Sequence, residues 1–396
     1  MKKSVIATIS LLFGLSLIAT GLVAVAQPAS KGTIKIAMPV PLSGPLSYIG
    51  QLTGAAAQLG LEDFGRLVGK QGFKLELQPE DDQAKADVAV AMANRLLTDN
   101  DVLAVMGYAQ SGLLIPASEV LAKGSLAVIT PFASNPLVTT RASTKAIVNR
   151  VCGRDDVQGP VAAEFAVKTL RAKRIFSIND SSAYGKGLSA AFEQAATSLG
   201  AQITSSNGVQ ETEVDFSTLV NRIATDKPDL IYFGGFYTQA AALLKQLRQK
   251  SVNTALLGGD GLDASELQKL GGEAIKNVYF TTNAPPLSAL PAAKRFSVRY
   301  KAKFNSDPIG YSTYIYDATR ATIQGISDAI KINKGERPTR EQVATAIRAV
   351  KFQGLGVRVA FDQNGDVEQG KYFVIEANTD YNMNKVRKAL TASAPK

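Results

Sequence analysis

Residues 174–208 read RIFSINDSSAYGKGLSAAFEQAATSLGAQITSSNG, and this stretch sets the fold class. The apolar run at 174–179 predicts a buried strand, the amphipathic pattern at 188–199 predicts a helix, and 202–208 predicts a second strand. A strand, a helix and a strand in this order form a β-α-β unit, in which the two strands lie parallel and the helix covers one face of the sheet.

The same alternation extends in both directions along the chain. Before this unit, short apolar runs predict five strands, at 33–41, 73–79, 103–107, 126–131 and 146–151. After it, three more follow at 229–234, 255–258 and 278–282, with amphipathic patterns between the strands. Five strands followed by five strands predict an α/β protein with two doubly wound, parallel-sheet lobes.

The end of the chain departs from this rhythm. Helical patterns at 291–304, 312–331 and 339–350 precede an expected hairpin of 357–361 and 371–377. The DQNG turn at 362–365 and Asp366 invite comparison with a calcium loop. The sixth position is Val367 and the twelfth is Phe373, where such a loop requires Gly and Glu, so a turn is the better interpretation.

The composition excludes several classes of enzyme. The 396 residues contain no His and one Cys. A Ser-His-Asp triad, an HExxH zinc site, an intramolecular disulfide and a multi-thiolate metal site are therefore impossible. We expect no cofactor and no metal. The 44 Lys and Arg against 34 Asp and Glu are spread along the chain, so they indicate a solvated surface and no nucleic-acid partner.

The first 26 residues have the pattern of a secretory signal peptide. Lys2 and Lys3 precede the apolar segment 5–23, and Ala24-Val25-Ala26 forms a cleavage site. The alternative is a transmembrane anchor, because the apolar segment is nearly long enough to span a bilayer. Cleavage would release a periplasmic protein starting at Gln27, with no cysteine nearby for a lipid anchor.

Polar residues that could bind a ligand follow the predicted strands, at the place where ligands of open α/β sheets bind. Ser111 follows the third strand and Ser134 the fourth, and both can donate to a carboxylate beside helix N-termini. Asp260, between Gly259 and Gly261, can accept a hydrogen bond from an ammonium group. This division suits a zwitterion, although each serine alone could be a helix cap and Asp260 a turn acid.

Four aromatic residues lie near the same strand ends. Phe132, Phe236, Tyr48 and Tyr184 could line an apolar or stacking pocket. Core packing is the ordinary alternative for an aromatic residue at a strand end.

Several motifs carry a family resemblance. They include Ser43-Gly44-Pro45, Asp81-Asp82, Thr130-Pro131, Tyr184-Gly185 and Gly234-Gly235. Their order and spacing resemble the leucine/isoleucine/valine-binding protein family, the type I periplasmic binding proteins of branched-chain amino acid ABC transporters. The resemblance covers the mature chain.

The family fold implies two lobes joined by three crossovers, near 150–153, 281–286 and 354–357. The N-terminal lobe would then hold 27–151 and 283–355. The C-terminal lobe would hold 152–282 and 356–396. Closure of the two lobes would complete the binding site and expel water.

The resemblance also assigns roles in ligand binding. Ser111 and Ser134 match residues that hold the carboxylate and ammonium groups of the amino acid, with the Ala133 backbone beside Ser134. Asp260 matches the acid that binds the ammonium, and Tyr184 matches a binding tyrosine. Where relatives carry a second tyrosine this chain has Phe236, and Tyr48 is one residue before the expected aromatic position.

The function implied is that of an exported, monomeric receptor, not an enzyme. It would capture an amino acid, branched-chain or otherwise hydrophobic, and deliver it to a membrane ABC permease. An alternative on the same fold is a receptor for an amide, a urea or an aromatic acid. A secreted hydrolase is a third hypothesis, although the chain has no GxSxG motif and no P-loop.

Overall fold

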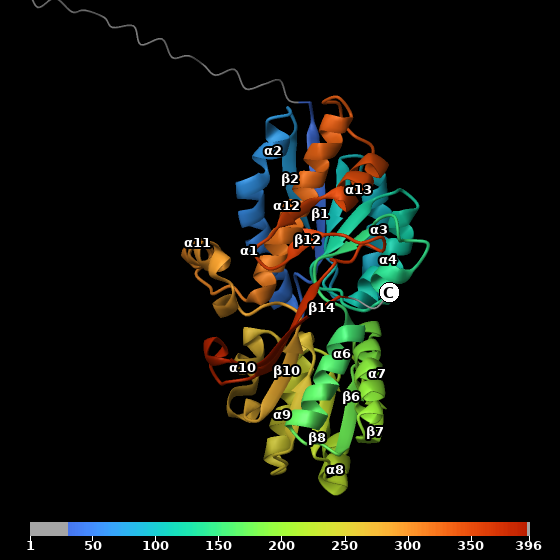
Figure 1. The fold of residues 1–396 in the computed structure, drawn as a ribbon. Coiled ribbons are helices and arrows are strands. Elements are labelled where there is room, and N and C mark those ends of the chain that lie inside the picture. The colour runs from blue at the N-terminus through green and yellow to red at the C-terminus, as the bar shows by residue number, and fades with distance from the viewer. Residues whose placement is uncertain (1–30, 394–396) are drawn as a thin grey trace, which may run out of the picture.

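The structure is a computed structural model that describes residues 31–393. The expected signal peptide at 1–26 lies outside the described residues. Figure 1 shows two lobes, one above the other, each with a central sheet and helices on both faces. This arrangement confirms the predicted fold class.

The first lobe contains a five-stranded parallel sheet in the order β2-β1-β3-β4-β5. Its strands are β1 (Thr33–Val40), β2 (Lys74–Asp81), β3 (Val102–Met106), β4 (Ala127–Thr130) and β5 (Val148–Arg150). The helices of this lobe are α1 (Ser47–Phe64), α2 (Arg66–Gly69), α3 (Ala86–Thr98), α4 (Ser111–Ala122), α5 (Leu137–Thr140), α11 (Lys294–Phe304), α12 (Gly310–Ile332) and α13 (Arg340–Ala349).

The second lobe contains a seven-stranded sheet in the order β14-β13-β10-β9-β8-β6-β7. Its parallel strands are β6 (Arg174–Asn179), β7 (Gln202–Gly208), β8 (Leu230–Gly234), β9 (Ala255–Gly258) and β10 (Val278–Thr282). Antiparallel β13 (Gly370–Glu376) and β14 (Lys385–Ala392) extend it. The helices are α6 (Asp155–Glu164), α7 (Ala183–Ser198), α8 (Ser217–Asp226), α9 (Tyr237–Gln249) and α10 (Ser265–Gly271).

The central strands are buried on both faces, which explains their continuous apolar sequences. All five residues of β3 and all five of β8 are buried. The helices cover both faces of each sheet with apolar side chains, forming one large cluster around the first sheet and two clusters on opposite faces of the second. This packing fixes the strands and leaves the loops at their carboxyl ends to form the cleft.

The C-terminal hairpin differs from the one that the sequence predicted. Strand β12 (Arg358–Ala360) pairs with β11 (Lys351–Gln353) in a small separate sheet. Strand β13 lies between β10 and β14, and no strand was predicted at the position of β14. The predicted turn does form, because the Asp362 carboxylate accepts hydrogen bonds from the backbone N–H groups of residues 364–366.

Between β1 and β14 the chain crosses three times from one lobe to the other. The first follows β5 and the second follows β10. Val357, Val359 and Val367 still pack in the core of the first sheet, and β13 in the second sheet begins at Gly370. The third crossover therefore follows Val367, which moves residues 356–367 from the predicted C-terminal lobe into the first lobe.

Within residues 31–393, no helix has both the length and the apolar character required to cross a bilayer.

Candidate functional site

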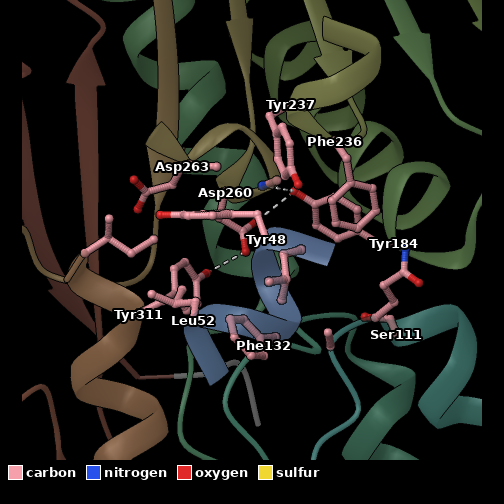
Figure 2. A pocket seen from close by; sticks show the side chains of 16 residues that line it. Tyr48, Leu52, Ser111, Phe132, Tyr184, Phe236, Tyr237, Asp260, Asp263 and Tyr311 are labelled. Atoms are coloured by element: carbon pink, nitrogen blue, oxygen red, sulfur yellow. Dashed lines mark hydrogen bonds between the residues drawn. The ribbon is translucent and has the colours of Figure 1, made fainter. Parts of the chain in front are cut away.

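A cavity of about 50 Å³ lies between the two lobes, at the carboxyl ends of the parallel strands. This volume has room for a few water-sized groups and suits a small molecule. Its lining comes from both lobes: Tyr48, Ile49, Leu52, Ala109, Gln110, Ser111, Phe132, Ile309 and Tyr311 from the first, and Tyr184, Phe236, Tyr237, Asp260, Gly261, Asp263 and Ala264 from the second. Figure 2 shows these side chains around the cavity.

The register of the second sheet explains how its three lining loops meet. Asn179 of β6 lies beside Gly234 of β8, and Phe233 lies beside Gly258 of β9. Because these parallel strands end at the same level, the loops that follow them lie together at the carboxyl edge of the sheet. Tyr184, Phe236 and Asp260 therefore converge although they are far apart in the sequence.

Asp260 is the most heavily hydrogen-bonded side chain of the cavity. Its Oδ1 accepts from the Tyr184 hydroxyl at 2.8 Å and from Gln158 Nε2 at 2.7 Å. Its Oδ2 accepts from the Tyr311 hydroxyl at 2.6 Å and from Asn283 Nδ2 at 3.4 Å. Figure 2 shows Asp260 between Tyr311 and Tyr184. The four donors are uncharged, so none of them neutralises the negative charge of the carboxylate.

Burial raises the pKa of Asp260, although the hydrogen bonds from Tyr311, Gln158 and Tyr184 act in the opposite direction. Asp155, the first residue of α6, is a second buried acid close to it. Burial, together with the Asp260 charge, raises the pKa of Asp155 well above its usual range. A positive group placed in the cavity would favour the ionised form of Asp260.

Aromatic rings form much of the remaining wall. Phe132 stacks on Tyr311 with ring centroids 5.3 Å apart and an interplanar angle of 24°. Tyr184 and Phe236 lie 5.3 Å apart at 41°. Tyr48 meets Tyr237 edge to face at 6.3 Å, and its hydroxyl accepts a hydrogen bond from Ser265 Oγ at 3.2 Å. These rings surround the polar groups with apolar surface.

Ser111 is the first residue of α4, where backbone N–H groups have no partner within the helix. Its hydroxyl lines the cavity and accepts a hydrogen bond from the Asn135 N–H at 3.1 Å. The hydroxyl hydrogen can therefore be donated to an acceptor in the cavity. An oxyanion at this place would also gain from the N-terminal end of the helix dipole.

Six of the eight predicted site residues line the cavity: Tyr48, Ser111, Phe132, Tyr184, Phe236 and Asp260. The other two, Ala133 and Ser134, lie behind its wall. The Ala133 carbonyl accepts a hydrogen bond from Arg150 Nη1, and the Ser134 side chain is buried. Direct contact of Ser134 with a ligand stays a prediction.

Sequence reasoning missed several lining residues. Tyr311 is the second residue of α12 and no local motif marks it. It follows Tyr48, Phe132 and Tyr184 by more than a hundred residues. Asp263 was missed although it lies three residues after Asp260, a spacing that could have suggested a shared wall. Its carboxylate accepts from the Thr282 and Tyr381 hydroxyls, and burial raises its pKa to about 6.

The cavity is acidic. Asp260 and Asp263 line it, and none of its described lining residues is Lys or Arg. A ligand carboxylate would therefore rest on hydroxyl and backbone N–H donors, and a ligand cation on a carboxylate. Among residues 31–393, no group of His, Cys, Asp and Glu side chains has an arrangement suited to hold a metal ion.

Comparison with known proteins identifies relatives of the whole described fold. The family described as periplasmic binding protein matches residues 33–382. A Leu/Ile/Val-binding protein, BraC3, of Rhizobium johnstonii is 32% identical over 341 residues, which cover 86% of this chain and 90% of the relative.

Two solved structures extend the comparison. The leucine-binding protein LivK of Thermotoga maritima superposes with a TM-score of 0.80 at 30% identity, covering 90% of this chain and 98% of that protein. A solute-binding protein of R. palustris in complex with benzoate has a TM-score of 0.80 at 17% identity, with coverage of 92% and 98%. The second likeness is informative about the fold alone.

Proposed function

The chain belongs to the periplasmic binding protein family, and from this premise we propose that it captures an amino acid in the interlobe cavity and delivers it to an ABC permease. The preferred ligand is a branched-chain or other hydrophobic amino acid. One observation carries the proposal: Asp260 presents a carboxylate to the cavity while its hydrogen-bond donors within the protein are all uncharged.

The two ends of an amino acid fit opposite sides of the cavity. Asp260 binds the ammonium group through a charge-assisted hydrogen bond. The hydroxyl of Ser111 and the N-terminus of α4 bind the carboxylate. Tyr48, Phe132 and Phe236 contact the side chain, while Ala133, Ser134 and Tyr184 complete the binding loops.

A receptor for an aromatic acid, an amide or a urea is the second candidate. The stacked rings of Phe132 and Tyr311 favour it, because a flat ligand could lie against them. The charge of the cavity disfavours an aromatic acid, because an anion would meet Asp260 and Asp263 with no lysine or arginine in the described lining. An amino acid carries the cation that such a cavity requires.

The family also supports the expected partners and location. We propose an exported, monomeric periplasmic protein, cleaved after Ala26 and without a lipid anchor, that acts as a receptor and not as an enzyme. N-terminal sequencing of the exported protein should start at Gln27. Its macromolecular partner is the membrane permease, and it has no nucleic-acid partner.

A thermal-unfolding screen with the twenty amino acids, benzoate and simple amides tests the ligand class. A ligand that binds only the folded state stabilises it by about 2.7 kcal/mol at one hundred times its dissociation constant. We expect leucine, isoleucine or valine to raise the melting temperature and the corresponding amines without a carboxylate to do so much less. Stabilisation by benzoate or amides, with none by any amino acid, would overturn the proposal.

A further inference from the structure

We propose that Arg150 is a positioning residue that holds the ligand-binding loop 133–135 and joins it to two of the three crossovers. Arg150 is the last residue of β5, directly before the first crossover, and its side chain is fully buried. It does not line the cavity. The inference rests on the proposed function for its effect on affinity, whereas the hydrogen bonds that carry it are independent of any ligand.

All five N–H groups of the Arg150 guanidinium are used. Nη1 donates to the carbonyl of Ala133 at 3.0 Å and to that of Asn135 at 2.9 Å. Nε and Nη2 donate to Oδ1 of Asp366 at 2.9 and 2.6 Å, and Nη2 also donates to Thr139 Oγ1 at 2.8 Å. A planar guanidinium offers these directions together, which a lysine ammonium cannot do.

Asp366 connects Arg150 to Arg154, which lies beyond the first crossover in the second lobe. Its Oδ2 accepts from Arg154 Nη1 at 3.1 Å and from Thr139 Oγ1 at 3.0 Å. Arg154 directly precedes α6 in the second lobe, and Asp366 directly precedes the third crossover. The two arginines lower the pKa of Asp366 against the effect of burial, so it remains ionised near neutral pH.

Loop 133–135 transmits this anchoring to the cavity. The Asn135 N–H donates to Oγ of Ser111, the residue proposed to bind the carboxylate of the amino acid. The Asn135 side chain donates to the Ala183 carbonyl at the start of α7, across the cleft, at 2.7 Å. The Ser134 carbonyl accepts from the backbone N–H of Asp155 at 3.0 Å. The loop that Arg150 holds is thus hydrogen-bonded to Ser111 and to the N-terminal ends of α6 and α7, the first two helices of the second lobe.

The test compares Arg150→Lys with Arg348→Lys. Arg348 is a matched control, because it also binds the segments beside these crossovers, through Asn149 Oδ1 and the carbonyls of Lys145, Val148 and Gln363. None of these four hydrogen bonds reaches loop 133–135. Arg150→Lys removes a fully buried guanidinium and Arg348→Lys a half-buried one, so both changes should lower the melting temperature.

Two measurements separate positioning from general stability. In the ligand-free proteins, we expect amide hydrogen exchange of the segment 131–136 to accelerate in Arg150→Lys and to stay at the wild-type rate in Arg348→Lys. In leucine titrations, we expect Arg150→Lys to lose at least tenfold in affinity, mainly through faster dissociation, and Arg348→Lys to change less than threefold.

Thr139→Val provides a milder variant if Arg150→Lys does not fold. It removes one acceptor of Arg150 and one donor to Asp366, and it should give a smaller acceleration of exchange in the same segment. Wild-type exchange at 131–136 in a folded Arg150→Lys or Thr139→Val protein would overturn the inference, as would an equal affinity loss in Arg348→Lys. If the wild type binds no amino acid, the proposed function fails, and the ligand-free exchange still decides the role of Arg150.

Discussion

At the scale of single residues, Asp260 shows how a turn position becomes a binding group. Its flanking glycines and its place after β9 suggested either a turn acid or an ammonium site. Its carboxylate faces the cavity and accepts hydrogen bonds from both lobes, since Tyr311 lies in the first lobe and Tyr184 in the second. The same acid therefore also contributes to holding the lobes together.

We expect Asp260→Asn to reduce amino-acid affinity more than a hundredfold. An ammonium left without its charged partner in a buried site costs about 3–5 kcal/mol, and about 1.4 kcal/mol corresponds to tenfold in affinity. Titration calorimetry of the wild type and the variant measures this loss. The melting temperature without ligand should change little, because the amide preserves the shape of the side chain.

The pH dependence of binding checks the same assignment. The pKa of Asp260 is raised above 3.8 in the ligand-free protein, and the ammonium group requires the ionised form. Protons therefore compete with the ligand, so affinity should fall as the pH is lowered from neutral into the acid range. The fall should be shallower in Asp260→Asn, and equal pH profiles for the two proteins would contradict an ammonium site at Asp260.

At the scale of elements, the short 3-10 helix Asp260–Leu262 that follows β9 depends on close contact with the backbone of a neighbouring loop. A Cβ at Gly261 would lie 2.3 Å from the carbonyl oxygen of Gly235, in the neighbouring loop. No alanine fits without displacing one of these loops. The glycines around Asp260 therefore let two lining loops approach each other.

We expect Gly261→Ala to lower amino-acid affinity at least tenfold and to lower the melting temperature, because the shift moves Asp260 relative to Tyr184. Gly54→Ala in α1 is the control, since a Cβ there meets no atom within 4 Å. Replacing a helical glycine with alanine should stabilise the protein by about 0.5–1 kcal/mol and leave affinity unchanged. Wild-type affinity in Gly261→Ala would show that binding does not require the close contact between Gly261 and the carbonyl of Gly235.

At the scale of the whole molecule, buried acids couple the fold to pH. Burial raises the pKa of Asp82 to about 7, of Asp317 to about 7 and of Asp263 to about 6. Each carboxyl binds its proton more tightly in the folded chain than in the unfolded chain. The folded state thus holds more protons between about pH 4 and pH 7, and stability falls as pH rises through this range.

We therefore expect the ligand-free protein to be more stable in urea at pH 5.5 than at pH 7.5. Asp317→Asn should reduce the difference in stability between the two pH values. Asp317 is fully buried, and its carboxylate accepts hydrogen bonds from the backbone N–H groups of residues 355–357. Urea unfolding at the two pH values measures both effects. Stability that rises from pH 5.5 to 7.5 would contradict the assignment of raised pKa values to these buried acids.

The sequence alone determined the alternation of strands and helices up to β10 and most of the loops that carry the candidate site. Apolar runs such as 230–234 and amphipathic patterns such as 188–199 are local signals. Because parallel strands end at a common edge, the residues that follow them can be predicted to converge. Ser111, Phe132 and Asp260 were found in this way, before any contact was known.

Only the tertiary structure decided the contacts between distant segments. Asp366 lies 216 residues from Arg150, and Tyr311 reaches Asp260 from a helix that follows the second crossover. The pairing of β12 with β11, and not with β13, likewise depends on which lobe holds residues 357–367. Local periodicity marks which residues are buried, whereas their partners are fixed by how the lobes pack. The sequence therefore predicted Asp260 and the strand at 357–361, whereas their partners Tyr311 and β11 came only from the tertiary structure.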